Sequence, residues 1–208
     1  PKPYVLAKLM WDPYQDVDAL LDEWYERTVG PEAAPYLKAF YEHWEDFWQN
    51  RIVATDWFQS RKNIVYFLFN SAAYLSIVSD EEIAQSRAWL EAAVAHAQTD
   101  KQRARAEKIL RAFEYYEASA LSYPKAVSAP ADATSALALL EAASDYRERV
   151  HYAQKRLQLI DEFAGDPVLF HPTDPRRLNM VWSGLTANAF WHLVDYLKTN
   201  EPAGGPVT

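Results

Sequence analysis

The chain has 208 residues, half of them hydrophobic and 24% charged, proportions that are typical of a globular protein and not of a disordered or fibrous one. Its 21 Lys and Arg stand against 29 Asp and Glu, and this net charge of −8 argues against non-specific nucleic-acid binding, which needs clustered positive charge. The chain has no cysteine, which excludes disulfides and Cys-ligated metals, and only 5 glycines, which favours a mostly helical fold.

Residues 1–13 contain a short apolar segment, Tyr4-Val-Leu-Ala-Lys-Leu-Met-Trp11, that is bounded by prolines. A run of this length is typical of a strand buried on both faces, the kind found in parallel sheets. Only residues 51–58 offer another strand, and weakly, so the expected strand has no partners in this chain. Either the strand prediction is wrong, or its partners lie upstream and this segment is the last strand of a barrel. The absence of an initial Met favours a piece of a longer or processed protein.

From residue 14 to residue 200 the apolar positions recur every three or four residues, as in amphipathic helices. The predicted helices lie between Asp16 and Gly30, across Leu37–Trp48, and at approximately 58–77, 80–97, 100–121, 133–163 and 178–198. The Pro-containing break at 122–132 is a candidate division of this helical domain, and residues 201–208 are expected to form a flexible tail. The predicted fold class is all-α, an irregular bundle of about seven helices with one strand-like segment at its N-terminus.

Two windows, 63–79 and 178–194, lack charged residues, but each is only 17 residues long and is broken by polar side chains. A membrane span needs about 20 predominantly apolar residues, so both windows are expected to be buried helices and no membrane span is expected. The helical spacing of a row of aromatic residues favours core packing over an exposed platform for sugar rings. This row comprises Trp44, Phe47, Trp48, Trp57 and Phe58.

The leading candidate for a binding site is Trp11-Asp12, at the end of the expected strand. In α/β barrels the active site lies at the carboxyl ends of the strands, where an indole can stack on a sugar and a carboxylate can hydrogen-bond its hydroxyls. The alternative is that Trp11 is a core ring and that Asp12 forms a turn ahead of Pro13.

Other constellations have simpler explanations. Glu42, His43 and Asp46 lie within one helical turn, a spacing that fits a metal, but a charged helix face with a chance histidine explains it better, and no metal is expected. His171 lies in a predicted loop whose turn-forming residues explain the sequence equally well. No Gly-rich phosphate loop, His-Glu-x-x-His helix or nucleophile-elbow pattern occurs, and no cofactor is expected.

The N-terminal motifs also resemble a known family. Tyr4-Val-Leu-Ala-Lys-Leu-Met-Trp-Asp-Pro13, Asp16-Val-Asp-Ala-Leu-Leu-Asp22 and Gly30-Pro-Glu-Ala-Ala-Pro35 are similar to a bacterial family of unassigned function. That family has a glycoside-hydrolase-type barrel, similar to those of alpha-glucuronidases and beta-hexosaminidases, and often continues into a helical C-terminal region. The resemblance is specific over residues 4–35 and looser over 81–123. It implies that residues 4–11 are the last barrel strand and that the parent protein is secreted or in the cell envelope.

The resemblance implies a non-catalytic helical C-terminal domain of a glycoside-hydrolase-like protein, because the two carboxylates of such hydrolysis would lie on earlier strands. This domain would brace the barrel, its active-site edge or a dimer interface. The expected partners are the upstream barrel, a carbohydrate and a second copy of the chain. The first alternative is an independent helical protein-interaction module, in which residues 4–11 form an extended arm. The second is a small stand-alone hydrolase, with His171 or an acid near Trp11 at its centre.

Overall fold

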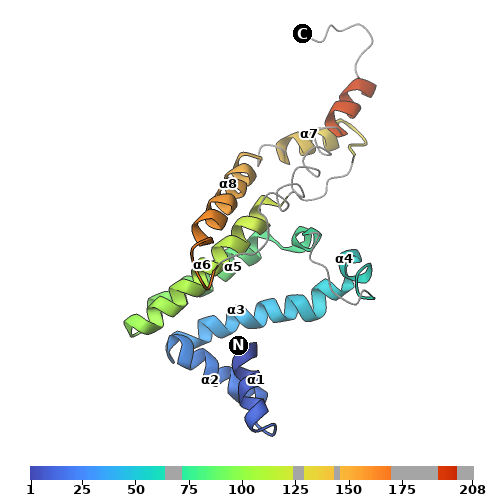
Figure 1. The fold of residues 1–208 in the computed structure, drawn as a ribbon. Coiled ribbons are helices and arrows are strands. Elements are labelled where there is room, and N and C mark those ends of the chain that lie inside the picture. Colours follow the sequence, from blue (N-terminus) through green and yellow to red (C-terminus); the bar gives the residue numbers. More distant parts are fainter. Residues whose placement is uncertain (64–71, 124–128, 143–145, 170–191, 201–208) are drawn as a thin grey trace. The chain divides into compact units, whose positions relative to one another are not determined.

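The computed structural model describes residues 1–63, 72–123, 129–142, 146–169 and 192–200 (Figure 1). Every regular element within these ranges is a helix and none is a strand, so the predicted all-α fold class is confirmed. No helix in the described part of the chain is both long and apolar enough to cross a membrane. Contacts divide the chain into two compact units, Pro1–Leu68 with Val78–Glu114 and Phe69–Ile77 with Tyr115–Thr208.

The segment predicted to be a strand forms a helix instead, α1 (Lys2–Trp11), so the strand prediction is wrong. An unpaired strand leaves its backbone N–H and C=O groups without partners, whereas a helix pairs them internally. Leu, Ala, Lys and Met are also strong helix formers, and a short apolar run has no period that separates a strand from a buried helix. The helix ends at Asp12, where the backbone becomes extended, and Pro13 prevents its continuation.

The first unit contains most of the helices. These are α1, α2 (Val17–Val29), α3 (Ala34–Asp46), the π-helix η1 (Phe47–Arg51), the 3-10 helix η2 (Ile52–Ala54), α4 (Asp56–Gln59), α5 (Asp80–His96) and the first part of α6 (Asp100–Ser122). Since η1, η2 and α4 contain all of residues 51–58 except Thr55, the second strand candidate is wrong as well. The predicted start of α2 is confirmed: Asp16 Oδ1 accepts hydrogen bonds from the Asp18 and Ala19 N–H groups, at 2.8 and 3.2 Å.

Gly30 ends α2 as predicted, and its conformation explains why glycine is needed there. Its φ of 93° lies in the region that residues with a Cβ rarely adopt. A Cβ at this position would also lie 2.8 Å from the Gln102 Cδ of α6. The Gln102 Oε1 itself accepts hydrogen bonds from the Gln98 and Thr99 N–H groups at the start of α6. Gly30 therefore sets both the end of α2 and its close approach to α6.

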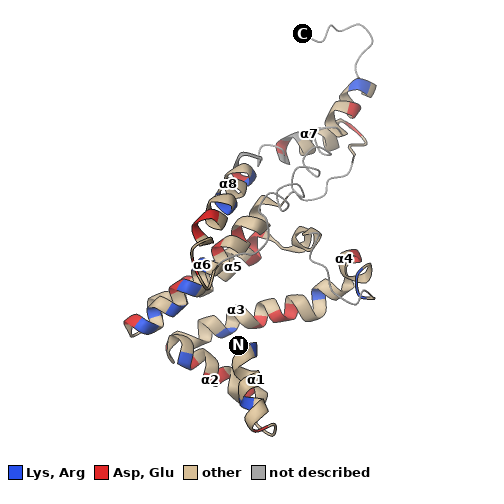
Figure 2. Ribbon diagram, in the orientation of Figure 1, with Lys and Arg blue, Asp and Glu red and all other residues tan. Residues whose placement is uncertain are grey.

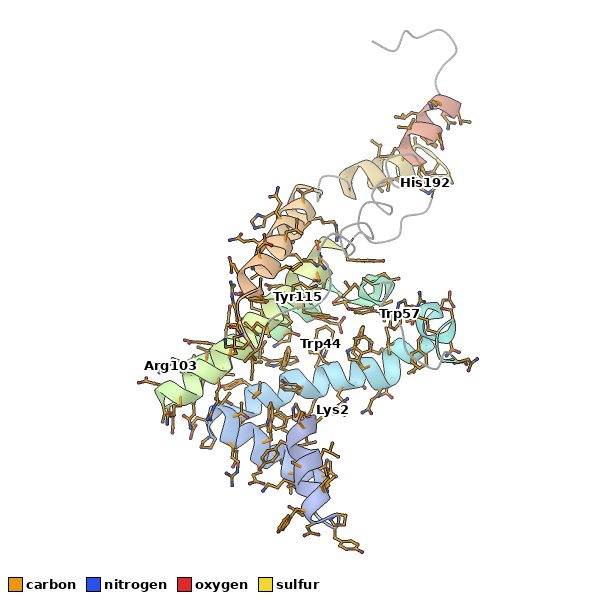
Figure 3. All side chains as sticks on the ribbon, viewed as in Figure 1. Lys2, Trp44, Trp57, Arg103, Tyr115 and His192 are labelled. Carbon is orange, nitrogen blue, oxygen red and sulfur yellow. The ribbon has the colours of Figure 1, made fainter. Side chains whose placement is uncertain are left out.

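Aromatic rings pack against one another within the first unit, beside a core that is mostly aliphatic. Trp24 meets Tyr41 edge-on at 5.4 Å between ring centroids, and Phe40 of α3 meets Phe113 of α6 at 5.6 Å. In the predicted aromatic row, the ring centroids of Trp44 and Phe47, of Phe47 and Trp48, and of Trp48 and Trp57 lie 5.3, 5.4 and 6.3 Å apart. Figure 3 labels Trp44 and Trp57. Phe47 is 0% and Trp57 is 6% exposed, so the core interpretation of these two rings is confirmed.

The second unit contains η3 (Ala73–Ile77), the remainder of α6, α7 (Ala133–Ala142), α8 (Tyr146–Phe163) and the helical residues 192–200. The described parts of the helix predicted for 133–163, which are α7 and α8, are helical as expected, and residues 143–145 lie outside the described ranges. Ala118, Leu159 and Phe163 form a buried apolar cluster. Beside it, the buried Arg156 donates hydrogen bonds from Nε to Ser119 Oγ at 2.9 Å and from Nη2 to the Tyr115 hydroxyl at 3.0 Å.

The predicted break after α6 agrees with the structure, because α6 ends at Ser122 and α7 begins at Ala133. The division of the helical domain near 122–132 stays a prediction. Most of the predicted helices at 58–77 and 178–198 falls outside the described residues, as do His171 and the tail at 201–208.

Candidate functional site

Trp11 and Asp12, the two predicted site residues, lie where α1 ends and the chain turns towards α2. Trp11 is 91% exposed, so it is not a core ring. Asp12 Oδ1 accepts a hydrogen bond from the Tyr14 N–H at 3.1 Å, and the Asp12 carbonyl oxygen accepts one from Gln15 Nε2 at 3.2 Å. Asp12 is therefore a turn former, as one of the two interpretations predicts, while Trp11 presents its indole to solvent.

An exposed indole beside a carboxylate has the chemistry to stack on a sugar ring and to accept a hydrogen bond from its hydroxyls. The structure keeps Trp11 and Asp12 adjacent but at the end of a helix, and not at the mouth of a barrel. Their role in sugar binding stays a prediction.

The α1–α2 turn is held by polar contacts that begin on α1. Lys8 Nζ lies 3.2 Å from Glu23 Oε2 of α2, and Gln15 Nε2 also donates to the Lys8 carbonyl oxygen at 3.2 Å. The nearby Tyr4 hydroxyl makes the largest contribution to lowering the pKa of the Glu23 carboxyl, and Lys8 makes the next largest. Glu23 thus stays ionised at neutral pH and ties the outer helix α1 to α2.

A second group of polar residues brings together α3, η1 and α5. At its centre is Glu82, in the first turn of α5, whose two carboxylate oxygens face Arg51, His43 and the Ser79 backbone. The Arg51 guanidinium donates to both oxygens, with Nη2 3.2 Å from Oε2. His43 Nε2 lies 3.2 Å from Oε1, and the Ser79 N–H donates to Oε2 at 3.0 Å. We refer to Glu82, Arg51 and His43 as the Glu82 cluster.

Aromatic rings and a π-helical turn surround the Glu82 cluster. The His43 ring lies between those of Trp44 and Trp89, at centroid distances of 5.1 and 5.7 Å. Arg51 is the last residue of η1, the π-helical turn that follows α3. A π-turn contains one more residue than an α-helical turn, so it changes the direction in which the side chains after α3 point. The Arg51 guanidinium lies over the Phe47 ring at 5.2 Å. The Trp44 Nε1 donates to the buried Ser86 Oγ at 3.1 Å, which joins α3 to α5 next to the cluster.

The electrostatics of the Glu82 cluster suit a structural ion-pair cluster that joins α5 to η1, and they do not suit a general acid. Partial burial raises the pKa of Glu82, but hydrogen bonds from Arg51 and the Ser79 N–H, together with His43, outweigh burial and leave it below its ordinary value. A general acid must hold a proton near neutral pH. Glu82 instead stays ionised, and the Arg51 guanidinium and the Ser79 N–H donate hydrogen bonds to its oxygens.

The Glu42, His43 and Asp46 constellation does not converge on one point. Lys38 Nζ lies 3.8 Å from Glu42 Oε1, and Asn50 Nδ2 donates to Asp46 Oδ1 at 2.7 Å, while His43 faces the Glu82 carboxylate. Within the described ranges no three His, Asp or Glu side chains are grouped to hold a metal ion.

Arg51, Glu82 and Ser86 were not among the predicted site residues. One local signal was present: Ser79 and Glu82 have the spacing of a capping box, and the structure shows that box at the start of α5. The capping box explains why Glu82 points back towards the N-terminus of α5. It does not reveal that Arg51, 31 residues earlier, meets the same carboxylate.

A family model described as "Domain of unknown function (DUF4838)" matches residues 1–42, about a fifth of the 208-residue chain. The matched region contains α1, α2 and the first turns of α3. No curated protein and no solved structure matches the chain. The chain is therefore similar to this family over its N-terminal helices.

Proposed function

We propose that this chain is the non-catalytic helical region of a glycoside-hydrolase-like protein, in which it braces the barrel domain. The observation that carries the proposal is the match of residues 1–42 to a family model, which coincides with the N-terminal motifs at 4–35. The barrel and its chemistry are what the motif resemblance implies.

The side-chain chemistry of the described residues supports a non-catalytic role. Glycoside hydrolysis needs two carboxyl groups about 5–10 Å apart, and the general acid must have a raised pKa. The pKa of Glu82 is lowered instead. Glu117, a buried carboxylate of α6, lies 3.6 Å from Lys155 Nζ. Both carboxylates face a cation, which favours a structural role for each.

The N-terminal helices have the contacts that a brace requires. A brace must be joined stiffly to the element that it supports, and α1 is attached to α2 through Lys8, Glu23 and Gln15. The α2 helix packs in turn on α3, and α3 on α5, in the same compact unit. These successive contacts support a fixed orientation of α1 relative to the core of the first unit.

The test is a pair of truncations in the parent protein. The first removes every residue after Asp16, and the matched control removes only 201–208. We expect the first truncation to lower the melting temperature of the barrel or to make it aggregate, and the control to leave both properties unchanged. A barrel that stays folded, monodisperse and unchanged in glycan affinity after the first truncation would rule out the bracing role.

An independent protein-interaction module is the second candidate, and the exposed apolar side chains of α1 favour it. Leu6, Met10 and Trp11 are 61%, 80% and 91% exposed. The coding sequence separates the two functions. A reading frame that continues upstream of Pro1 through the strands of a barrel supports the brace, and a start codon immediately before Pro1 supports the independent module.

A further inference from the structure

The outer face of α1 is apolar along its whole length. None of the residues of α1 is buried. Lys8 points towards α2, where it meets Glu23, and the residues on the opposite side of the helix are exposed. We call this side the outer face of α1, and it comprises Pro3, Leu6, Ala7, Met10 and Trp11. Figure 2 shows how few charged residues lie on α1.

The outer face is as large as the apolar patches through which proteins commonly interact. If each large side chain offers about 150–250 Å², the exposed fractions of Leu6, Met10 and Trp11 correspond to about 350–580 Å² of accessible surface. The largest apolar patch of a typical monomer measures about 300–600 Å². A standard interface buries about 800 Å² on each partner. The outer face therefore matches the largest apolar patch of a typical monomer, and residues beside α1 would supply the remainder of an interface of standard size.

Two opposite charges lie at the two ends of the outer face. Lys2 stands at the start of α1 (labelled in Figure 3) and Asp12 at its end, about 15 Å apart at the helical rise of 1.5 Å per residue. Neither side chain forms an ion pair with another described residue. A partner that places an acid at Lys2 and a base at Asp12 would complement both ends at once.

We propose that the outer face of α1 binds the same face of a second copy of this chain, with the two helices antiparallel about a twofold axis. In this register residue i lies opposite residue 14 − i of the other copy. Lys2 then faces Asp12 of the second copy, and the pair occurs twice because the interface is isologous. Ala7 lies on the axis, where its small side chain lets the two helices approach, and the antiparallel helix dipoles also attract.

The apolar residues fit this antiparallel register. Pro3 lies opposite Trp11 of the second copy, so that the most exposed indole covers the proline at the start of the other helix. Leu6 and Met10 fill the space between this contact and the axis, and the flexible Met side chain adapts to the packing. Each end of the outer face therefore carries the charge that the opposite end of a second copy requires, and this match is the argument for self-association.

Sedimentation equilibrium of the 208-residue chain over a range of concentrations tests the proposal, and we expect a monomer–dimer equilibrium. Trp11→Ala should raise the dimer Kd by roughly 30-fold or more, because the symmetric interface loses one indole ring from each of its two copies. The matched control is Val168→Ala, at a residue 71% exposed but outside α1, and it should leave Kd unchanged. Since Trp11 is 91% exposed, the variant should keep the helical circular dichroism of the wild type.

A charge exchange tests the antiparallel register. Lys2→Glu and Asp12→Lys should each raise Kd by roughly two- to tenfold, as rim ion pairs do, and the double variant should restore it. Each substitution places a charge that suits the dipole of α1. Asp12→Lys also removes the hydrogen bond from the Tyr14 N–H, so recovery of Kd in the double variant is what assigns the effect to the ion pairs. A chain that remains monomeric overturns the proposal, as does a dimer whose Kd is insensitive to Trp11→Ala. A double variant that fails to restore Kd also overturns it. None of these results depends on the presence of a barrel.

Discussion

Replacing Glu82 with Gln tests whether the Glu82 cluster stabilises the first unit. Gln has nearly the same shape as Glu, and its carbonyl oxygen can still accept the hydrogen bond from the Ser79 N–H. The substitution therefore removes the negative charge and leaves the helix cap in place. Arg51 and His43 lose the carboxylate that lies between them.

The expected loss follows from the contacts of the carboxylate. A hydrogen bond to a charged group contributes about 1.5–3 kcal/mol to stability. The Arg51 side chain is 40% exposed, so water partly screens its pair with Glu82, whose side chain is 16% exposed. We expect E82Q to lower the free energy of unfolding by about 1–2 kcal/mol.

Urea unfolding followed by circular dichroism at neutral pH measures this loss. Glu91→Gln is the matched control, because Glu91 is also on α5 and pairs with Arg87 at 3.2 Å, but its side chain is 56% exposed. The control should change stability by less than about 0.5 kcal/mol, as exposed i,i+4 pairs do. If E82Q costs no more than Glu91→Gln, the Glu82 cluster does not stabilise the first unit.

The pH dependence of stability provides a second measurement on the same variant. The pKa of Glu82 is lower in the folded protein than its ordinary value of 4.5. Its contribution is therefore fully present above that ordinary value and is lost as the pH falls through the lower, folded-state pKa. E82Q should unfold with a shallower loss of stability below pH 4.5 than the wild type does. If the stability of E82Q fell as steeply below pH 4.5 as that of the wild type, the lowered pKa of Glu82 would be contradicted.

Three further predictions concern the core of the first unit and the turn beside it. Gly30→Ala should cost about 1–2 kcal/mol in urea unfolding, because φ is 93° there and the new Cβ displaces Gln102; an equally stable variant would contradict this reason. Phe47→Ala should cost about 3–5 kcal/mol, since the ring is 0% exposed, and a loss below about 1 kcal/mol would mean that the site collapses around the cavity. Burial, with a smaller contribution from Glu42 and Glu45, raises the pKa of Tyr25 to about 12. The folded protein favours the neutral phenol, so this contribution to the free energy of unfolding is lost as the pH rises from about 10 towards 12. In an absorbance titration of phenolate, Tyr25→Phe should remove amplitude near pH 12; a loss near pH 10 would contradict the raised pKa.

The fold class was predictable because its signals are local. A period of three to four residues between apolar positions identified the helices, and short-range caps identified several of their ends. The helix α2 begins after Asp16 and ends at Gly30 as predicted, since a helix cap depends only on residues within one turn of the cap. The same reasoning placed Phe47 and Trp57 in the core.

The N-terminal segment shows where local reasoning fails. Eight successive residues, seven of them apolar, suit a buried strand and a helix equally well, and the choice depends on what is available to pair the backbone. The structure pairs it within α1. Once the segment is a helix, the position of Trp11 also changes, from the end of a barrel strand to the exposed end of α1.

The candidate sites divide in the same way. That Trp11 and Asp12 are neighbours, and that Asp12 forms a turn ahead of Pro13, followed from the sequence because a turn involves adjacent residues. The Glu82 cluster did not follow, because its members come from three elements and because the π-turn that ends at Arg51 has no sequence signature.

By itself, the sequence determined that this chain is helical, acidic and rich in core rings, since composition, period and capping act over a few residues. Tertiary structure alone decided which side chains meet across long separations, such as Arg51 with Glu82 and Trp44 with Ser86. It also decided that the outer face of α1 stays exposed. The physical reason is that such contacts depend on how whole helices pack, and a local pattern specifies a helix without specifying its neighbour.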